Sequence, residues 1–334
     1  EHLPKWVPVS IAGYNGGDTG LNAWQELGAV LANAIEYLDE VKRRGRMDMT
    51  VAAQRVGGGN FRTTMEIFED AAELRAARKM WHKLLTERYG ITDERALRMR
   101  IHIVTSGAYM QYQQPFNNIV RGTLMALTAV LGGTQSLGVS GYDEAISIPS
   151  EHAHQMAVRI QQILEHETNI PAVTDPLGGS YYVESLTAEL ERRAWEFVDQ
   201  LLAQGGFLAT LDSGWLHARA RENQESQAIA EARGERKIVG VNCFKEDITP
   251  WEVDGFPPVT DAYPVALERL HAVRRERHES AATAAMRELA ATCRDANRNI
   301  MPVMMQAVDA EVTIGEIGDI FRQAWGDWQT PKLV

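Results

Sequence analysis

The chain has 334 residues and a formal net charge of −11, with 45 acidic against 34 basic side chains. Hydrophobic residues make up 45% and charged residues 24%, which is typical of a globular protein with one large or two ordinary domains. The acidic balance excludes nucleic acid as the main partner, because phosphate binding needs a basic surface. No apolar run reaches the length that a membrane span requires, so we expect no membrane association.

The cysteine content and the chain start bear on cellular context. Cys243 and Cys293 lie far apart with no CxxC pair, which excludes a disulfide scaffold and a cysteine-based zinc site. This usage indicates a reducing compartment, and we expect a cytoplasmic protein. The first residues, Glu1-His2-Leu3-Pro4-Lys5-Trp6, lack both an initiator methionine and a signal-peptide layout. We therefore expect that the numbering begins inside a longer chain or in one gene of a split protein.

The first half of the chain alternates short apolar stretches with long amphipathic ones. Strands are predicted at 7–12, 53–59, 100–105 and 134–139, and helices at 22–44, 61–89, 117–131 and 151–168. Such alternation predicts an α/β fold with parallel strands and right-handed crossovers. In these sheets chemistry collects at the carboxyl ends of the strands, where the glycine- and polar-rich segments 13–20, 106–107 and 138–144 fall.

Four parallel strands alone leave two unpaired edges. The sheet is therefore either an open one with insertions or the last four strands of an eight-stranded barrel, and we favour the barrel.

The pattern changes after residue 170. A turn is predicted at 175–180, followed by a helix capped by Thr187 and a charged helix at 215–236. A proline-bearing loop at 249–264 precedes a basic and then alanine-rich helix at 265–297, and one or two short helices finish the chain within 299–326. This part is expected to be mostly helical.

Local patterns alone identify few chemical groups. Segment 13–20 is glycine-rich but matches neither GxGxxG nor GxxxxGK[ST], so a tight turn is favoured over a phosphate-binding loop. His102 alternates with Ile101 and Ile103, and is either a hydrogen-bonded core histidine or a substrate-facing one. The polar segment 134–136 is either a structural hydrogen-bond ladder or an uncharged lining for an amide or thioester.

Several longer motifs follow one another in a fixed order. They are Pro4-Lys5-Trp6, Ser10-Ile11-Ala12-Gly13-Tyr14, Arg75-Ala76-Ala77-Arg78, Arg100-Ile101-His102, Asn117-Asn118-Ile119-Val120-Arg121, Leu131-Gly132-Gly133-Thr134-Gln135-Ser136-Leu137, Asp143-Glu144-Ala145 and Asp175-Pro176-Leu177-Gly178-Gly179-Ser180-Tyr181-Tyr182-Val183-Glu184-Ser185-Leu186-Thr187. Together they resemble the large subunit of methylmalonyl-CoA mutase and related acyl-CoA mutases, over essentially the whole chain.

The resemblance implies the second half of a (β/α)8 TIM barrel, strands five to eight, over residues 1–170, and a helical extension of the large subunit over 171–334. In this family acyl-CoA threads the barrel axis, and adenosylcobalamin lies across the carboxyl ends of the strands. An adenosyl radical abstracts a substrate hydrogen, and a group such as the thioester carbonyl migrates to the neighbouring carbon. We therefore expect a partner that carries strands one to four, as upstream sequence or a separate subunit. The cobalt ligand is expected from a separate small cobalamin-binding subunit.

The resemblance also assigns roles to single residues. His102 matches a histidine that contacts the CoA arm, and Gln135 and Ser136 match the polar lining near the thioester. Glu144 matches an acidic residue close to the corrin and the adenosyl group, and Asp18 stands where the family usually has glutamate. No metal ligand is expected in this chain.

Several positions depart from the family pattern around the ligand. Asn15 follows Tyr14 where the family has a histidine that binds the migrating carbonyl; asparagine donates a neutral hydrogen bond but cannot act as an acid. Val104 replaces a glutamine, and Gly138-Val139-Ser140 replaces a His-Thr-Asn run that faces the corrin. Arg55-Val56-Gly57-Gly58-Gly59 stands where the family has Arg-x-Ser-Phe-Phe, and two lost phenyl rings open about 150 Å² or more of contact surface each.

These comparisons give a complete set of expected site residues. Asn15 and Gln135 are the expected catalytic residues. The expected substrate-binding residues are Tyr14, Arg55, Gly57, Gly58, His102, Val104 and Ser136. The expected cofactor-binding residues are Asp18, Gly138, Ser140 and Glu144.

Two functions are compatible with the departures. One is an active mutase that rearranges the carbon skeleton of a branched acyl-CoA, of the methylmalonyl-CoA/succinyl-CoA type or with a bulkier aryl- or alkyl-substituted malonyl group. The other is a non-catalytic structural subunit of a heteromeric mutase. Retention of Gln135, Ser136, Glu144 and His102 favours the active enzyme.

Overall fold

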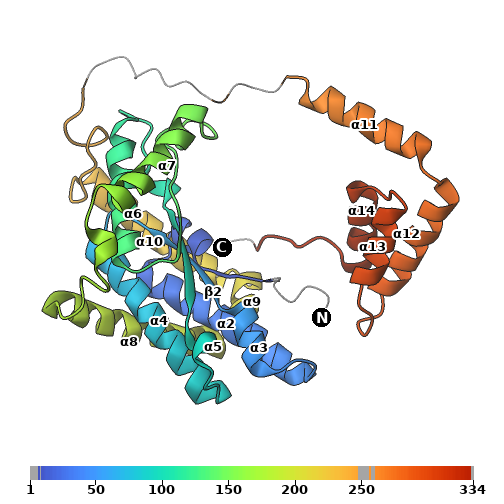
Figure 1. Cartoon of the computed structure of the whole chain (residues 1–334), viewed down its shortest axis with the longest axis horizontal. Helices are drawn as coiled ribbons and strands as arrows, with labels where there is room; N and C mark the ends of the chain where they lie inside the picture. Colours follow the sequence, from blue (N-terminus) through green and yellow to red (C-terminus); the bar gives the residue numbers. More distant parts are fainter. Residues whose placement is uncertain (1–6, 8, 247–255, 257–259, 332–334) are drawn as a thin grey trace. The chain divides into compact units, whose positions relative to one another are not determined.

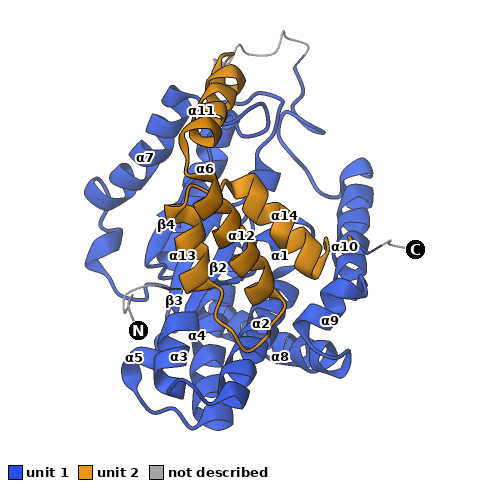
Figure 2. Ribbon diagram, turned by 90° about the vertical axis from the view of Figure 1, so that its right-hand side faces the viewer, with its two compact units in different colours: residues 1–256, 331–334 blue, residues 257–330 orange. Residues whose placement is uncertain are grey.

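The computed structural model describes residue 7, residues 9–246, residue 256 and residues 260–331. The chain divides into two compact units, Glu1–Phe256 with Pro331–Val334 and Pro257–Thr330, which Figure 2 colours separately. Residues 171–246 thus belong to the same unit as the strands. The boundary expected at residue 170, which concerns regions of the family fold, stays a prediction.

A parallel sheet lies at the centre of the first unit, with its strands ordered as in the chain, β1-β2-β3-β4. The strands are β1 Ile11–Ala12, β2 Gly58–Thr63, β3 Arg100–Thr105 and β4 Ser136–Gly138. Helices connect each strand to the next, so the predicted α/β alternation with parallel strands is confirmed. This sheet is consistent with part of a TIM barrel.

The helices of the first unit form the connections and the segment that follows the sheet (Figure 1). They are α1 Tyr14–Asp18, α2 Ala23–Arg44, α3 Met49–Val56, α4 Ile67–Tyr89, α5 Glu94–Leu97, η1 Gly107–Tyr109, α6 Asn117–Leu131, α7 Glu151–His166, η2 Ile170–Ala172, α8 Tyr181–Ala203, α9 Phe207–Asp212 and α10 Trp215–Ala232. The predicted helix at 22–44 is confirmed, and begins with a capping box between Asn22 and Gln25. Among the residues described, none of the helices combines the length and apolarity needed to cross a bilayer.

The predicted strand at 53–59 is wrong. Its first residues lie in α3, because Asp48 caps this helix by accepting hydrogen bonds from the backbone N–H groups of Thr50 and Val51. The strand runs instead over Gly58–Thr63, which removes the first turns from the helix predicted at 61–89, so that α4 begins at Ile67. The error came from the glycines, which weaken a strand pattern.

Two further predictions need correction. Segment 13–20 contains the short helix α1 in place of a simple loop. Ser180, not Thr187, caps α8; the Thr187 hydroxyl lies inside the helix and donates to the Val183 carbonyl. The Pro4-Lys5-Trp6 motif and most of the loop predicted at 249–264 lie outside the described residues.

One face of the sheet packs against the helices and forms the main core. Ile11, Phe61, Ile101 and Ile103 point to this face and are buried, together with Trp81 of α4, whose Nε1 donates to the Ala96 carbonyl at 3.0 Å. Full burial of each such side chain contributes roughly 1.5–3 kcal/mol. The alternate residues of the strands therefore point to the opposite face, which corresponds to the axis of a barrel.

Helix α8 lies beside α2 and α4 (Figure 1). Its approach to α2 is close: a Cβ on Gly28 would lie 3.0 Å from the Ala194 carbonyl oxygen and from the Phe197 ring. Arg75 of α4 forms ion pairs with Asp175 and, at 2.7 Å, with Glu184 of α8. The Arg75 and Asp175 motifs therefore meet in space, where they hold α8 on the half-barrel.

Over residues 260–330, the second unit contains four helices: α11 Ala262–Glu276, α12 Glu279–Cys293, α13 Met301–Asp309 and α14 Ile314–Trp325. The predicted single helix at 265–297 is therefore two helices, separated by the extended backbone of Arg277 and His278. The two short helices at the end are confirmed. Arg277 bridges Glu316 and Glu279, at 2.7 and 2.9 Å.

Candidate functional site

A row of side chains crosses the axis-facing side of the sheet. The strand register aligns Ala12, Asn60, His102 and Ser136 on β1 to β4. On β3 the neighbouring Ile101 and Ile103 are buried in the core, so His102 points the other way and is half-buried. The row combines a methyl group, an amide, an imidazole and a hydroxyl, which are neutral or weakly basic groups suited to an uncharged polar ligand.

His102 and Ser136 interact directly, with 2.8 Å between Nδ1 and Oγ. The hydrogen bond orients the imidazole on the axis face and leaves Nε2 available for a ligand. Both residues were expected at the substrate, and the structure brings them together.

Asn60 is a member of the row that was not expected. Its Oδ1 is buried and accepts no hydrogen bond from the described residues, which is unusual for an amide oxygen. The sequence did not reveal Asn60, because the second strand was predicted at 53–59. With β2 at Gly58–Thr63, the alternation places Asn60 and Arg62 on the axis side and Phe61 in the core.

Gln135 lies immediately before β4, at the amino end of the sheet. Its Oε1 accepts from the Ile101 backbone N–H at 2.7 Å, and its Nε2 donates to the Gly133 carbonyl at 2.8 Å. The side chain therefore joins the start of β4 to β3. The structure does not bring it to the carboxyl ends, where Tyr14 and Asn15 lie.

The glycines of the expected site differ in their surroundings. A Cβ added to Gly58 would meet no atom within 4 Å, and one added to Gly138 would lie 3.7 Å from the Val104 side chain. The axis face is therefore open at both positions. A Cβ added to Gly57 would instead lie 2.7 Å from the Ala53 carbonyl oxygen and 3.2 Å from the Trp81 ring, and Arg55 lies in α3, before the strand.

The expected cofactor residues lie at the carboxyl ends of the strands. Ser106, directly after β3, donates to Asp18 Oδ1 at 2.5 Å, and Ser140, after β4, donates to the Thr105 carbonyl at 2.7 Å. Glu144 lies beside Gly107, where an added Cβ would be 3.4 Å from Glu144 Cγ. Asp18 thus follows β1, Ser140 and Glu144 follow β4, and all three lie at the carboxyl ends of the strands.

Tyr14 and Glu144 have perturbed ionisation at these carboxyl ends. Burial, together with the carboxylates of Asp18 and Glu144, raises the pKa of Tyr14 to about 12. Burial and the neighbouring carboxylates of Asp143 and Asp18 also raise the pKa of Glu144. Tyr14 therefore stays a neutral hydroxyl donor at physiological pH.

A buried ion pair lies behind α1. Arg62 Nε is 3.1 Å from Glu26 Oε2, and burial raises the pKa of Glu26 to about 7 although the guanidinium lowers it. The glycines of segment 13–20 make room for this pair: a Cβ on Gly17 would lie 2.1 Å from Glu26 Oε2, and one on Gly13 would lie 2.5 Å from Glu26 Cγ. The segment is thus rich in glycine because the backbone passes directly over Glu26 and Arg62.

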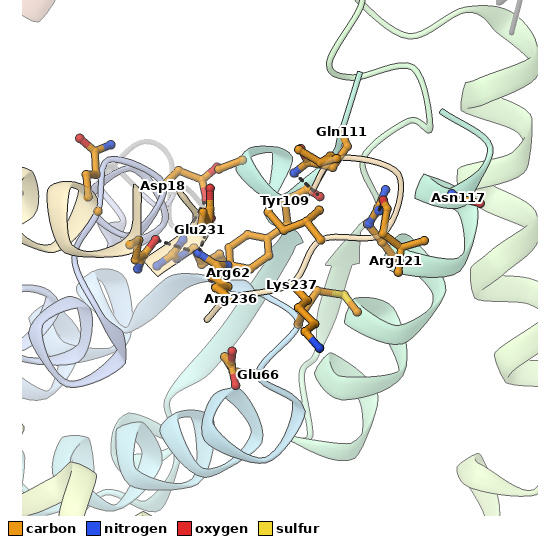
Figure 3. Close-up of a pocket in the computed structure, with 18 of the residues that line it drawn as sticks. Asp18, Arg62, Glu66, Tyr109, Gln111, Asn117, Arg121, Glu231, Arg236 and Lys237 are labelled. Carbon is orange, nitrogen blue, oxygen red and sulfur yellow. Dashed lines mark hydrogen bonds and ion pairs between the residues drawn. The ribbon is translucent and has the colours of Figure 1, made fainter. Parts of the chain in front are cut away.

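A cavity of about 670 Å³ opens beside Arg62, between the carboxyl ends of the strands and the segment after α10 (Figure 3). At one side Arg236 lies over the Tyr109 ring, 5.0 Å from its centroid, and pairs with Glu231 at 3.0 Å. At the other side Arg121 donates to the Val239 carbonyl at 2.8 Å. The sequence did not predict that residues within 231–239 line this cavity, because the residues after 215 showed only a charged helical pattern.

The side chains at the carboxyl ends suit the group that the family uses. The periphery of a corrin carries amide groups, which both donate and accept hydrogen bonds. Ser140 supplies a hydroxyl, Tyr14 a neutral phenol, and Asp18 and Glu144 supply acceptors on this edge. Among the described residues, no group of three or more histidine, cysteine, aspartate or glutamate side chains is arranged to hold a metal ion.

The chain matches known proteins over nearly its full length. The family profile described as methylmalonyl-CoA mutase matches residues 1–327. The chain is 35% identical over 332 residues to the 2-hydroxyisobutanoyl-CoA mutase large subunit of Aquincola tertiaricarbonis, covering 99% of this chain and 59% of that protein. It is 38% identical over 330 residues to the methylmalonyl-CoA mutase of Cereibacter sphaeroides, covering 98% and 45%.

A third relative is the methylmalonyl-CoA mutase large subunit of Streptomyces virginiae, 31% identical over 335 residues, with 98% of this chain and 45% of that protein covered. The chain thus spans about half the length of the curated relatives that it matches. The resemblance in the sequence motifs is confirmed, and the chain belongs to the methylmalonyl-CoA mutase family.

Proposed function

We propose that this chain supplies half of the active site of an adenosylcobalamin-dependent acyl-CoA mutase, which rearranges the carbon skeleton of a branched acyl-CoA. The observation that carries the proposal is the aligned row on the axis face, Ala12, Asn60, His102 and Ser136, in a member of this family. A thioester and the amides of a CoA arm are uncharged polar groups. This row offers them neutral hydrogen-bond partners without a competing charge.

Within this function the residues of the chain bind and orient the substrate. Ser136 orients the His102 ring, and the free nitrogen of that ring faces the CoA arm. Tyr14, whose raised pKa keeps its hydroxyl protonated even at alkaline pH, donates to the acyl group at the carboxyl end. Asn15 contributes a neutral hydrogen bond in place of the usual histidine, so polarisation of the migrating carbonyl needs no proton transfer from this position.

The cofactor would lie on the edge formed by Asp18, Gly138, Ser140 and Glu144. When bound, adenosylcobalamin supplies an adenosyl radical through homolysis of its cobalt–carbon bond. The chain's own residues hold the edge in place through the bonds from Ser106 to Asp18 and from Ser140 to Thr105. The cobalt ligand would come from a separate cobalamin-binding subunit.

The open axis face supports a bulky acyl group. Gly138 lies at the carboxyl end of β4, where an added Cβ would make only ordinary contact with Val104, at 3.7 Å. Gly58 lies at the opposite, amino end of β2, opposite Arg100. An aryl- or alkyl-substituted malonyl-CoA would use the space at Gly138, whereas methylmalonyl-CoA would leave part of it empty.

The chain needs a second half. Four strands cannot close a barrel, and β1 and β4 each have only one neighbour among the described strands. Further strands, from the rest of the same polypeptide or from another subunit, would pair with these two edges. The name "large subunit" of two relatives supports a heteromeric assembly, in which we propose a small cobalamin-binding subunit as a further member.

One observation favours the alternative, a structural subunit without catalysis. The side-chain amide of Gln135, an expected catalytic group, bonds to backbone groups of Ile101 and Gly133 through its oxygen and its nitrogen. Gln135 would then be retained for strand pairing alone.

Reconstitution distinguishes the two functions. The chain is produced with the polypeptide that completes the barrel and with the cobalamin-binding subunit, and the complex is supplied with adenosylcobalamin. Methylmalonyl-CoA and a panel of bulkier malonyl-CoA analogues are then followed by mass spectrometry. Interconversion of branched and linear acyl-CoA that depends on the cofactor supports the mutase; no turnover on any substrate with cofactor bound supports the structural subunit.

A further inference from the structure

One guanidinium joins the end of β2 to three points of the segment between β1 and α2. Arg62 Nε contacts Glu26 Oε2 at 3.1 Å, Nη1 contacts Asp18 Oδ1 at 3.4 Å, and Nη2 donates to the Leu21 carbonyl at 2.8 Å. The backbone N–H of Arg62 donates to Glu26 as well, at 3.3 Å. The connection therefore reaches the end of α1, the turn after it and the first turn of α2.

These contacts are shielded from water. The side chain of Arg62 is 10% exposed, that of Glu26 is 1% exposed and that of Asp18 is 20% exposed. In such surroundings a charge-assisted hydrogen bond fixes geometry far more firmly than it does at the surface. An arginine suits this role because its planar fork can hold several acceptors at once.

The other supports of the segment lie mainly at its two ends, where the Gly13 N–H donates to the Asn60 carbonyl at 2.7 Å, Asn223 Nδ2 donates to the Gly20 carbonyl at 2.9 Å, and Leu21 is buried. Helix α1 between them is one turn long and begins at Gly13, which has no side chain to cap it. Ser106 adds one contact, to Asp18, from the end of β3. The segment carries Tyr14, Asn15 and Asp18, which the proposed function places at the substrate and the cofactor, so its position matters for the reaction.

We infer that Arg62 is a positioning residue, which holds the segment from Tyr14 to Leu21 against the carboxyl end of the sheet and thereby aligns Tyr14 and Asn15 with the acyl group. The inference rests on the proposed function. It adds a residue that the family motifs do not point to, and it assigns a role to the buried partner Glu26.

The test uses the assembled enzyme and the double variant Arg62→Met/Glu26→Gln, which removes the contacts without leaving a lone buried carboxylate. Hydrogen–deuterium exchange of peptides covering 13–22 is measured together with kcat and KM. We expect faster exchange in these peptides and a fall in kcat of about 100-fold, because misplacement of reacting groups by about 1 Å has an effect of this size. KM should change much less, since the CoA arm contacts the row on β3 and β4.

Two further variants sharpen the result. Asp18→Asn keeps the Arg62–Glu26 pair and weakens the contacts of α1 with Arg62 and Ser106, so exchange in peptides 13–22 should rise less than in the double variant. The control is Arg277→Met/Glu316→Gln, which removes an ion pair of the second unit. Arg277 is 5% exposed there, so its side chain is shielded to a similar degree as that of Arg62, and loss of the pair should leave kcat unchanged.

The outcomes separate this inference from the function on which it rests. Faster exchange at 13–22 with unchanged kcat would make Arg62 a purely structural residue and overturn the inference. Unchanged exchange in the folded double variant would overturn it as well, whether or not the complex turns over acyl-CoA. Absence of turnover in the wild-type complex would instead contradict the proposed function.

Discussion

His102 on β3 and Ser136 on β4 lie side by side on the axis face, with 2.8 Å between Nδ1 and Oγ. The strand register sets this pairing, and the hydroxyl fixes the plane of the imidazole. Substitution Ser136→Ala should raise KM for acyl-CoA by up to about tenfold, the effect of one lost neutral hydrogen bond, and His102→Ala should raise it further. Steady-state kinetics of the assembled enzyme measures both.

His82→Ala is the matched control for His102→Ala, because His82 is exposed on α4 and lies away from the axis row. Its KM should equal that of the wild type. If His102→Ala also leaves KM unchanged, His102 is a core histidine that does not meet the substrate.

The room at Gly138 leads to a prediction about substrate size. Gly138→Val places two methyl groups on the axis face at the carboxyl end of β4, where an added Cβ would lie 3.7 Å from the Val104 side chain. The specificity constant kcat/KM for a bulky malonyl-CoA should fall by about 10- to 200-fold relative to that for methylmalonyl-CoA, because a change of one or two methyl groups in a pocket has effects of this size.

Competition between the two substrates on the same enzyme sample measures this ratio directly. Gly138→Ala, on β4, is a milder variant of the same kind and should shift the ratio in the same direction. An equal loss on both substrates would show that the valine disturbs the strand and not the acyl pocket.

The quality of the sequence-based prediction differed between neighbouring strands for physical reasons. The strand Arg100–Thr105 and the helix Asn117–Leu131 agree with the structure, because their apolar patterns coincide with their burial. Strand β2 was misplaced, since Gly58, Gly59 and Asn60 have low strand propensity and are held in place by pairing with β3. This shift concealed Asn60 and Arg62, the two axis-side residues of β2 that the motifs did not indicate.

Other site features depend on contacts between distant segments. Arg236 meets the Tyr109 ring from the end of α10, and Glu26 meets Arg62 from α2, at separations that no local pattern reports. Family motifs did locate Asp18, Ser140 and Glu144 at the carboxyl ends of the strands, because Asp18 follows β1 and the other two follow β4. The motifs also included Gln135, whose side chain the structure places in the backbone network at the other end of the strands.

The ion pairs of Arg75 predict how firmly α8 is held. Arg75 is 14% exposed, while its partners Asp175 and Glu184 are about half exposed, so solvent screens the interaction. Arg75→Met should lower the free energy of unfolding by about 1 kcal/mol in urea denaturation. Arg192→Met, which breaks exposed pairs on α8 itself, is the control and should leave the free energy of unfolding nearly unchanged. Equal effects would mean that Arg75 does not anchor α8.

Buried carboxyl groups on α4 predict an unusual dependence of stability on pH. Burial raises the pKa of Glu73 well above 4.5, and the nearby carboxylates of Glu26 and Asp70 raise it further; its Oε1 has no hydrogen-bond partner among the described residues. Burial likewise raises the pKa of Asp70 to about 7, against the opposing hydrogen bonds from Thr64. The folded protein therefore binds these protons more tightly than the unfolded chain does.

The direction of the pH dependence of stability follows from this difference. The stabilisation that protonated Glu73 contributes is complete below about pH 4.5 and declines as the pH rises above that value. The total loss amounts to up to about 1.4 kcal/mol for each unit by which the pKa in the folded protein exceeds that in the unfolded chain. Glu73→Gln carries no titrating proton, so its free energy of unfolding should fall less steeply between pH 5 and pH 8 and exceed that of the wild type at pH 8. Urea denaturation at both pH values tests this, with Glu87→Gln, exposed on the same helix, as the control. Parallel pH profiles for Glu73→Gln and the wild type would show that Glu73 ionises without penalty in the folded protein, and the decline would then have to come from Glu26 and Asp70.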